Sequence, residues 1–287
     1  MMNTLKWITA RGINLAYGGS QILRSYMADR ASYKILFSAR NDDLVWEQRV
    51  SKGFAFTRHQ IAFEKFEQAD PARYDLIVPL SLLAVEYIAA HPKWAPNNPL
   101  PTPSIECIGL CDNKLALNQK LIQKGHGDII PRIGTDLPFP YVIKKSRDGF
   151  GVNTHLIRNR DDEAKYKHLL DDPGYFAQEA IEGFQEYAAH LVIRDGKLVC
   201  HMGMKHHLPT NTSITGMYSK VVSSHPTRSR FTDQFVAALN AIKFEGLCCI
   251  DYKIVNGKPK LFEINPRMGS SLCPFFFSFV PELMRKA

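Results

Sequence analysis

The hydrophobic residues of the first hundred positions alternate between strand spacing and helix spacing. Residues 33–37 and 75–78 are short apolar runs, which are typical of buried strands. Ser81 then precedes apolar residues at helical spacing over 82–88 and is the predicted N-cap. Strands and helices in this order predict a small parallel sheet with helices on its faces.

A proline-rich stretch divides the chain. Before it, residues 6–9 predict a further short strand and Ser20 the N-cap of a further helix. Five prolines between residues 92 and 103 then interrupt the pattern. Because proline lacks an amide hydrogen and fixes its own backbone, this stretch is neither a helix nor a central strand. We predict an α/β domain over residues 1–103 and a second domain over residues 104–287.

The second domain mixes predicted helices and strands. Asp112 is the predicted N-cap of a helix that ends at Gly125, and Thr232 caps a later helix. Asp195-Gly196 is a strong hairpin signal between two apolar runs. Further strands are expected at residues 141–144, 152–157 and 176–181. Residues 204–230 lack clear periodicity and are interpreted as an irregular loop that borders a substrate site.

Near the C-terminus, residues 250–265 form a predicted hairpin that turns at Asn256-Gly257. Side chains alternate between the two faces of a strand. With a three-residue loop centred on Gly257, the apolar pairs on the core face are Ile250 with Ile264 and Tyr252 with Phe262. A two-residue turn would instead place the acidic residues of the two strands on opposite faces.

The three-residue loop places Asp251 opposite Glu263 on the other face, and Asn265 follows two residues later. Like charges directly opposite are unfavourable unless something neutralises them. Mg²⁺ prefers oxygen ligands and commonly sits between carboxylates and substrate phosphates. Asp251, Glu263 and Asn265 are therefore candidate metal ligands, with a surface hairpin carrying solvated acids as the alternative.

A lysine and a glycine-containing loop form the first segment suited to a nucleotide. Lys144 ends an apolar strand and leads into a loop that contains Gly149 and Gly151. A lysine fixed on a strand meets a phosphate as a point charge, and glycine lets backbone N–H groups approach phosphates. The alternative is an ordinary Gly-x-Gly turn without a ligand.

The second such segment places Glu179 and Glu186 seven positions apart. One carboxylate can accept a hydrogen bond from an adenine amino group and the other from ribose hydroxyls. Backbone groups at Ala180 and Ile181 can read the adenine edge. The alternative is a pair of exposed acids at strand ends.

Taken in order, these motifs resemble the ATP-grasp superfamily. The segments that carry the resemblance are Asp112-Asn113-Lys114, Val142-Ile143-Lys144, Gln178 to Glu186, and Asp251 with Glu263-Ile264-Asn265-Pro266-Arg267. Lys145 and Cys249 depart from the residues often found at these positions in the family. The resemblance implies an ATP-grasp fold of two α+β lobes, about 128–177 and 178–287, after a Rossmann-like pre-ATP-grasp domain.

The resemblance also implies a function. Lys114 and Lys144 would contact the phosphates of ATP, and the metal ligands would hold one or two Mg²⁺ ions, with Mn²⁺ as a substitute. Arg267 would be the catalytic residue that steadies the transferred phosphate or the acyl oxyanion, with a surface salt bridge as the alternative role.

The implied reaction is that of a carboxylate–amine ligase, which joins a small-molecule carboxylic acid to an amine through an acyl phosphate. Amino acids and peptides are among the expected substrates. A kinase, a carboxylase-like enzyme and a non-catalytic ATP-binding regulator are the alternatives.

Net charge and hydropathy indicate which classes of binding partner to expect. The net charge is +8, from 36 basic and 28 acidic residues, without the clusters of basic and aromatic residues typical of nucleic-acid binding. We interpret the excess as a cleft for anions rather than for nucleic acid. No apolar run approaches the ~18 residues needed to cross a bilayer, and the N-terminus lacks a signal-peptide pattern. The expected location is the cytoplasm, with no membrane partner; the oligomeric state is not indicated.

The six cysteines and several histidines offer other ligands. No cysteines form a Cys-x-x-Cys pair, so they are expected to be reduced and buried. A zinc site from Cys107 and Cys111 with distant histidines is the alternative. His201, His206 and His207 are candidates for metal ligands or a general base, against the commoner role of solvated or hydrogen-bonded histidines.

Overall fold

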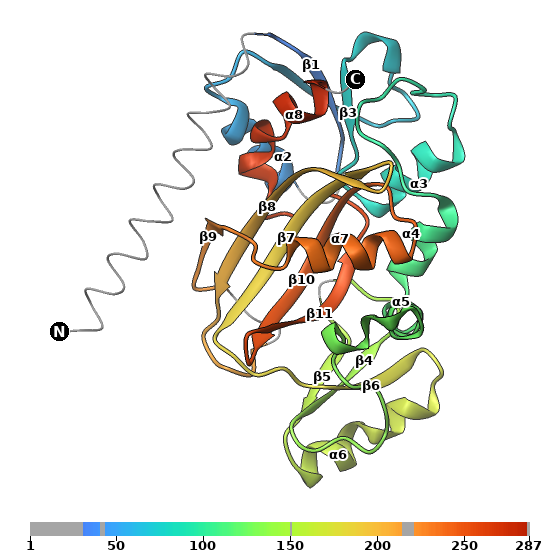
Figure 1. Cartoon of the computed structure of the whole chain (residues 1–287), viewed down its shortest axis with the longest axis vertical. Coiled ribbons are helices and arrows are strands. Elements are labelled where there is room, and N and C mark those ends of the chain that lie inside the picture. The colour runs from blue at the N-terminus through green and yellow to red at the C-terminus, as the bar shows by residue number, and fades with distance from the viewer. Residues whose placement is uncertain (1–30, 41–43, 150, 214–220, 286–287) are drawn as a thin grey trace, which may run out of the picture.

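A parallel sheet forms the N-terminal part of this computed structural model, which describes residues 31–40, 44–149, 151–213 and 221–285 (Figure 1). Its strands β1 (Lys34–Ser38), β2 (Gln60–Glu64) and β3 (Leu76–Val78) lie in the order β2-β1-β3. The predicted parallel sheet is therefore confirmed. The predicted strand at residues 6–9 and the helix capped by Ser20 lie outside the described residues.

Two helices pack on this sheet. α2 (Leu44–Phe54) buries Trp46, Val50 and Phe54 in the cluster that contains the β1 residues Ile35 and Phe37. α3 (Leu82–Ala90) belongs to a separate cluster with Leu36 and Ile77, whose side chains point to the other face. The Ser81 hydroxyl accepts a hydrogen bond from the Ala84 N–H at 3.2 Å, so the predicted N-cap is confirmed. Residues 92–103 form neither helix nor strand.

The helix predicted to begin at Asp112 is instead two helices. α4 (Ile105–Asp112) ends at Asp112, and α5 (Lys114–Leu121) begins after Asn113, whose side chain accepts from the Ala116 N–H at 3.0 Å. The prediction that Asp112 is the cap is wrong because its carboxylate is bound by Arg147. The chain then continues as a π-helical turn, η2 (Ile122–His126), in which Gly125 has φ of +87°.

A small antiparallel sheet follows. β4 (Tyr141–Lys145), β5 (Thr154–Ile157) and β6 (Tyr175–Glu179) lie in the order β5-β4-β6, close to the predicted strands. α6 (Arg160–Tyr166) and the short 3₁₀ helix η4 (Lys167–Asp171) cover its apolar side.

A five-stranded antiparallel sheet forms the centre of the structure. Its strands are β7 (Gln185–Arg194), β8 (Lys197–His207), β9 (Ser223–Thr227), β10 (Gly246–Val255) and β11 (Lys258–Asn265), in the order β11-β10-β7-β8-β9. Asp195 and Gly196, with φ of 52° and 69°, form the predicted hairpin turn between β7 and β8. α7 (Thr232–Ala241) buries Phe235 and Leu239 in the cluster that also contains α5 residues.

Two predictions for this region are wrong. Residues 204–230 are not one irregular loop, since β8 continues to His207 and β9 pairs with it; residues 214–220 lie outside the described part. The two strands are held by pairing with each other and with β7, and such pairing leaves no periodic pattern in the sequence. Thr232 does not cap α7: it is the first helical residue, and its buried hydroxyl has no hydrogen-bond partner among the described residues.

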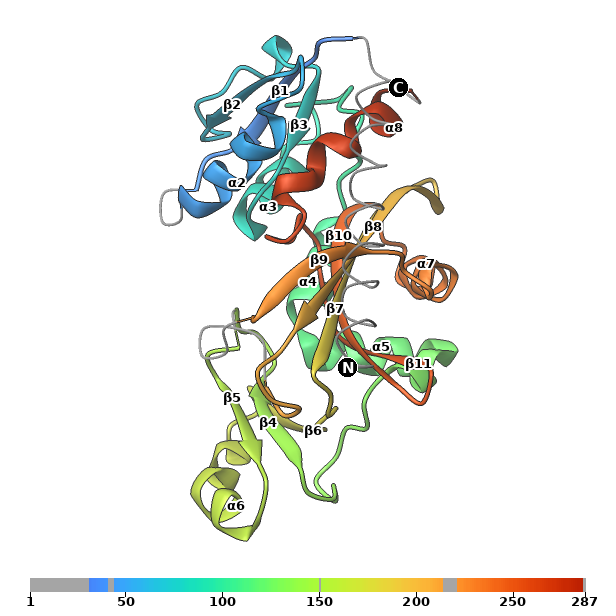
Figure 2. The same cartoon turned by 90° about the vertical axis from the view of Figure 1, so that its left-hand side faces the viewer.

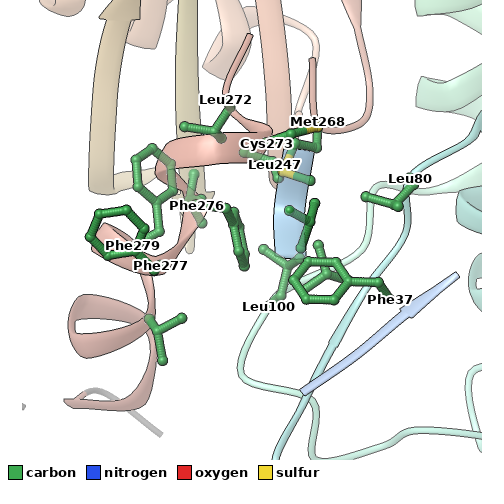
Figure 3. Close-up of a cluster of buried hydrophobic side chains, with 14 of the residues drawn as sticks. Phe37, Leu80, Leu100, Leu247, Met268, Leu272, Cys273, Phe276, Phe277 and Phe279 are labelled. Atoms are coloured by element: carbon green, nitrogen blue, oxygen red, sulfur yellow. The ribbon is translucent and has the colours of Figure 1, made fainter. Parts of the chain in front are cut away.

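The C-terminal segment returns to the N-terminal sheet. A 3₁₀ helix, η5 (Cys273–Ser278), and α8 (Val280–Arg285) lie beside α2 and β1 (Figure 2). Phe276 meets Phe37 with ring centroids 5.7 Å apart, and Figure 3 shows these rings in one cluster with Leu100, Leu247 and Met268. Residues far apart in sequence thus hold the N-terminal sheet against the central sheet. Among the described helices, none is long and apolar enough to span a membrane.

Candidate active site

In the hairpin of β10 and β11, Asp251 pairs with Glu263 as predicted, but the turn differs from the predicted one. Asn256 and Gly257, with φ of 50° and 76°, form a two-residue turn, so Val255 pairs with Lys258. The three-residue loop and the Tyr252–Phe262 pair are therefore wrong, and Tyr252 pairs with Leu261.

A register shift between Asp251 and Tyr252 then leaves Phe262 as an extra residue on β11. A β-bulge of this kind changes the face on which the following side chains lie. Asp251 consequently faces Glu263, and Ile250 faces Ile264, as predicted. The bulge offsets the effect of the two-residue turn.

The two carboxylates share one amide group. The Asn265 side-chain N–H₂ donates to Asp251 Oδ2 at 3.1 Å and to Glu263 Oε1 at 2.9 Å. Arg267 in turn donates to Asn265 Oδ1 at 3.2 Å and to the Met268 carbonyl at 3.0 Å. Four side chains that sequence analysis selected are therefore in one network. The alternatives of solvated acids and a surface salt bridge for Arg267 do not match these contacts.

Two lysines face this network. Lys114 Nζ lies 3.3 Å from Glu263 Oε2 and also donates to the Asp148 carbonyl. Lys144 on β4 is buried, with its Nζ 5.3 Å from the centre of the Phe176 ring. Burial lowers the pKa of Lys144 to about 8, with Lys114 adding to the effect and Glu263 opposing it.

The pKa values of Asp251 and Glu263 are shifted in opposite directions. Burial, followed by the charges of Glu263 and Glu186, raises the pKa of Asp251 well above its ordinary value. Burial also acts to raise the pKa of Glu263, but Lys114, the Asn265 hydrogen bond and Lys144 outweigh it and lower the pKa. These two half-buried carboxyl groups thus differ in how readily they ionise, and a cation between them would favour the ionised form of both.

The donor set fits a hard divalent ion, because two carboxylates and an amide side chain lie together at the cavity wall. Within the described part of the chain, no group of three or more His, Cys, Asp or Glu side chains could hold a metal ion. That finding argues against zinc at Cys107 and Cys111. It does not exclude the predicted set, in which the third donor is an amide. All six cysteines are described, none forms a disulfide, and all but Cys200 are buried.

The loop after β4 is held on both sides. Besides the Lys114 contact, the Asp148 carboxylate accepts from the Asn153 N–H at 2.8 Å. Gly151 has φ of +64°, which favours glycine, whereas a Cβ added at Gly149 would meet no atom within 4 Å. Only Gly151 is required by the backbone conformation.

The segment after β6 also faces the cavity. Glu179 exchanges two hydrogen bonds with the Arg132 backbone, at 2.8 and 3.1 Å. The Ile181 carbonyl accepts from Lys253 Nζ at 3.1 Å. Glu186 on β7 is buried, close enough to Asp251 to raise its pKa.

One cavity of about 960 Å³ is lined by all the residues predicted to bind the nucleotide or the metal and by the predicted catalytic arginine. These residues are Lys114, Lys144, Gly149, Gly151, Glu179, Ala180, Ile181, Glu186, Asp251, Glu263, Asn265 and Arg267. Of the three candidate histidines, His206 lines the cavity, whereas His201 and His207 do not. Burial, with a smaller contribution from His225, lowers the pKa of His206 to about 4, so its ring is neutral at pH 7.

Other residues of the cavity were not predicted from the sequence. Lys253 shares the β10 face with Asp251, so strand alternation could have identified it. Trp46 and Arg49 come from α2, and no local spacing connects them with the hairpin. The Arg267 guanidinium carbon lies 5.3 Å from the centre of the Trp46 ring, a cation–π contact that joins the N-terminal part to the site.

A parallel N-terminal sheet, two further antiparallel sheets and a shared cavity define the fold of an ATP-grasp protein. Residues 111–271 match the model of the ATP-grasp domain, which is more than half of the chain. The chain belongs to the ATP-grasp family, whose members bind ATP.

Solved structures with the same fold are distant in sequence. An L-amino acid ligase from Bacillus licheniformis is 14% identical, with a TM-score of 0.56 over 86% of this chain and 70% of that one. A D-alanine–D-alanine ligase from Bacillus anthracis is 15% identical, with a TM-score of 0.54 over 83% and 88%. A biotin carboxylase from Campylobacter jejuni, in a complex with β-γ-ATP, is 13% identical, with a TM-score of 0.55 over 90% and 71%. No curated protein sequence matches the chain.

Proposed function

We propose that the protein is an ATP-dependent carboxylate–amine ligase. The observation that carries the proposal is the network of Asp251, Glu263, Asn265 and Arg267, which faces Lys114 and Lys144 across one cavity. Carboxylates for a divalent ion beside cations for phosphates are the requirements of phosphoryl transfer. The L-amino acid ligase and D-alanine–D-alanine ligase among the similar structures support this choice.

In this proposal, Lys114 and Lys144 hold the phosphates of ATP and Glu179 to Ile181 hold the adenine. Glu186 binds the ribose hydroxyls. Asp251, Glu263 and Asn265 hold Mg²⁺, which supplies neutralisation of charge on the phosphates when bound. For the amide oxygen of Asn265 to bind the ion, it must replace the N–H₂ group that now contacts both carboxylates.

The chemistry then requires two displacements. The carboxylate oxygen of the acid attacks the γ-phosphorus, and the bond to the bridging oxygen breaks, releasing ADP. The amine nitrogen next attacks the acyl carbon, loses a proton, and expels phosphate to leave an amide. Arg267 is positioned to stabilise the negative charge that develops in both steps, because the Met268 carbonyl and Trp46 hold it at the cavity wall.

The test is ADP release from pooled acids and amines with Mg-ATP. Wild type is expected to release ADP only when an acid is present, and formation of the amide should require both substrates. Glu263→Gln should lose about two orders of magnitude or more in turnover, because it removes a metal-binding charge and the partner of Lys114. The matched control is Glu67→Gln, an exposed acid of the N-terminal part.

Four outcomes would contradict the proposal. Unchanged turnover in Glu263→Gln would remove the metal assignment. A stable phosphorylated product without any amine would identify a kinase, and bicarbonate as the required acid would identify a carboxylase-like enzyme. ATP binding without turnover of any acid would favour a regulator.

A further inference from the structure

The cavity has a wall on which Arg267 is the one residue that acts in the proposed reaction. We call it the α2 wall, and it consists of Trp46, Arg49, Arg267, Ser270, Ser271 and Phe275. Arg267 belongs to the network at the acidic hairpin, but Arg49 comes from a different element and has no role there.

The position of Arg49 follows from the packing of α2. Trp46, Val50 and Phe54 are buried, and Arg49 flanks this face one turn after Trp46. Gly53 lies so close to η5 that a Cβ added there would be 2.6 Å from the Pro274 carbonyl oxygen. Because α2 is fixed by this backbone contact (Figure 2), the Arg49 side chain is held at the cavity.

Among the residues that the structure describes, the α2 wall carries no acidic side chain. Arg49 makes no hydrogen bond or ion pair with any residue that the structure describes. α2 lines the cavity with Trp46 and Arg49 only, and residues 267–275 include no acidic residue. The acids of the cavity, among them Asp251 and Glu263, lie on other elements, and none of them pairs with Arg49. A guanidinium group without a paired acid attracts anions.

Other observations agree that positive charge is concentrated here. Burial raises the pKa of the Cys273 thiol to about 12, although Arg49, Arg267 and Arg40 all oppose that effect. The Arg40 and Arg267 guanidinium carbons both lie near the Trp46 ring, at 4.5 and 5.3 Å from its centre. Three arginines from three segments therefore surround one part of the molecule.

We infer that the acid substrate carries a second anionic group, a carboxylate or a phosphate, in addition to the carboxylate that is activated, and that Arg49 binds it. This inference rests on the proposed ligase function. The planar guanidinium group pairs with either anion through two parallel hydrogen bonds, and the hydroxyl of Ser270 offers a further donor. The phosphates of ATP have their own cations in Lys114 and Lys144, so they do not need Arg49.

The test uses pairs of acids in which one member carries the second anionic group and the other lacks it. The probes are succinate against succinamate, L-glutamate against L-glutamine, and 3-phosphoglycerate against glycerate. Affinity is measured by calorimetry with Mg²⁺ and a non-hydrolysable ATP analogue. Turnover is measured with Mg-ATP and hydroxylamine, which converts an acyl phosphate to a hydroxamate.

Wild type is expected to prefer the dianionic member of at least one pair by about tenfold or more, the size of one charge-assisted hydrogen bond. Arg49→Gln should lose that preference while keeping its affinity for the neutral member. Arg49→Lys should restore part of it, because the charge remains without the planar geometry. Lys52→Gln, which removes an exposed charge from the same helix outside the cavity, is the control.

The outcomes separate this inference from the ligase proposal. A dianion preference in binding that Arg49→Gln abolishes, without hydroxamate formation, would support the second anion site and refute the ligase. Hydroxamate formation that shows no dianion preference, or that Arg49→Gln reduces equally for both members of each pair, would refute the second anion site alone. Absence of binding by every dianionic probe would also overturn the inference.

Discussion

Replacing Lys144 by methionine should make the protein more stable while it weakens ATP binding. The ammonium group is buried on β4, and its pKa is lowered from 10.5 to about 8, chiefly by burial. A shift of that size corresponds to about 3 kcal/mol of unfavourable free energy for keeping the group charged in the folded state.

Methionine removes that cost and keeps a side chain of similar length. It also loses the cation–π contact of Lys144 with Phe176, worth about 1 kcal/mol, while its sulfur can contact the same ring. The net expectation is a gain of about 2 kcal/mol in the free energy of unfolding at pH 7.

The pH dependence identifies the cause. Between pH 8 and 10.5 the unfolded chain retains the Lys144 proton and the folded protein releases it, so the stability of wild type rises with pH in that window. The advantage of Lys144→Met should therefore be largest below pH 8 and should decline toward pH 10.5.

Urea unfolding of both proteins, without Mg²⁺ or nucleotide, at pH 7, 8, 9 and 10 measures this difference. ATP affinity, measured separately at pH 7, should fall by about tenfold or more, because a charge-assisted contact is lost. A variant that is less stable than wild type by the same amount at every pH would refute the reasoning, since the ammonium group would then not be penalised by burial.

Three other changes test the packing around the site. Gly269→Ala should lower the free energy of unfolding by about 1–3 kcal/mol in urea unfolding and reduce turnover, because the new Cβ would lie 2.6 Å from His190 Cε1 and 2.7 Å from Cys249 Sγ. Wild type should lose stability as the pH falls from 6.5 toward 3, because burial lowers the pKa of His190 to about 3 and the unfolded chain takes up that proton first. His190→Gln should flatten this part of the stability–pH curve, and an unchanged curve would contradict the pKa of His190. Gly151→Ala should weaken ATP binding more than Gly149→Ala, because only Gly151 has a positive φ; equal effects in nucleotide titrations would contradict this.

The local pattern of apolar and polar residues was enough to predict helices and strands whose two faces differ clearly in polarity. β1, β3 and α3 were predicted because a buried run or a capped amphipathic turn is visible within ten residues. β2 and α2 were not predicted, and both depend on contacts with distant segments: β2 pairs in parallel with β1, and α2 packs on η5. Parallel pairing and helix docking have no spacing signal in the sequence.

In the candidate site too, local motifs could be predicted from the sequence, and contacts between distant segments could not. The candidate nucleotide, metal and catalytic residues lie within short segments, and all of them line one cavity. The facing of Asp251 and Glu263 was predicted with the wrong turn, because the bulge at Phe262 depends on how two strands pair and not on either strand alone. Trp46 and Arg49 could not be assigned to the cavity, since only the folded chain brings α2 beside the residues after β11.

The central claim is that the bulged hairpin binds a divalent ion together with the nucleotide. Its most direct test is the affinity of the protein for Mn²⁺ with a non-hydrolysable ATP analogue, measured from the electron paramagnetic resonance signal of free Mn²⁺. Asp251→Asn and Glu263→Gln should each weaken this affinity by about tenfold or more, and Glu67→Gln should leave it unchanged. Equal affinity in wild type and both hairpin variants would contradict the account.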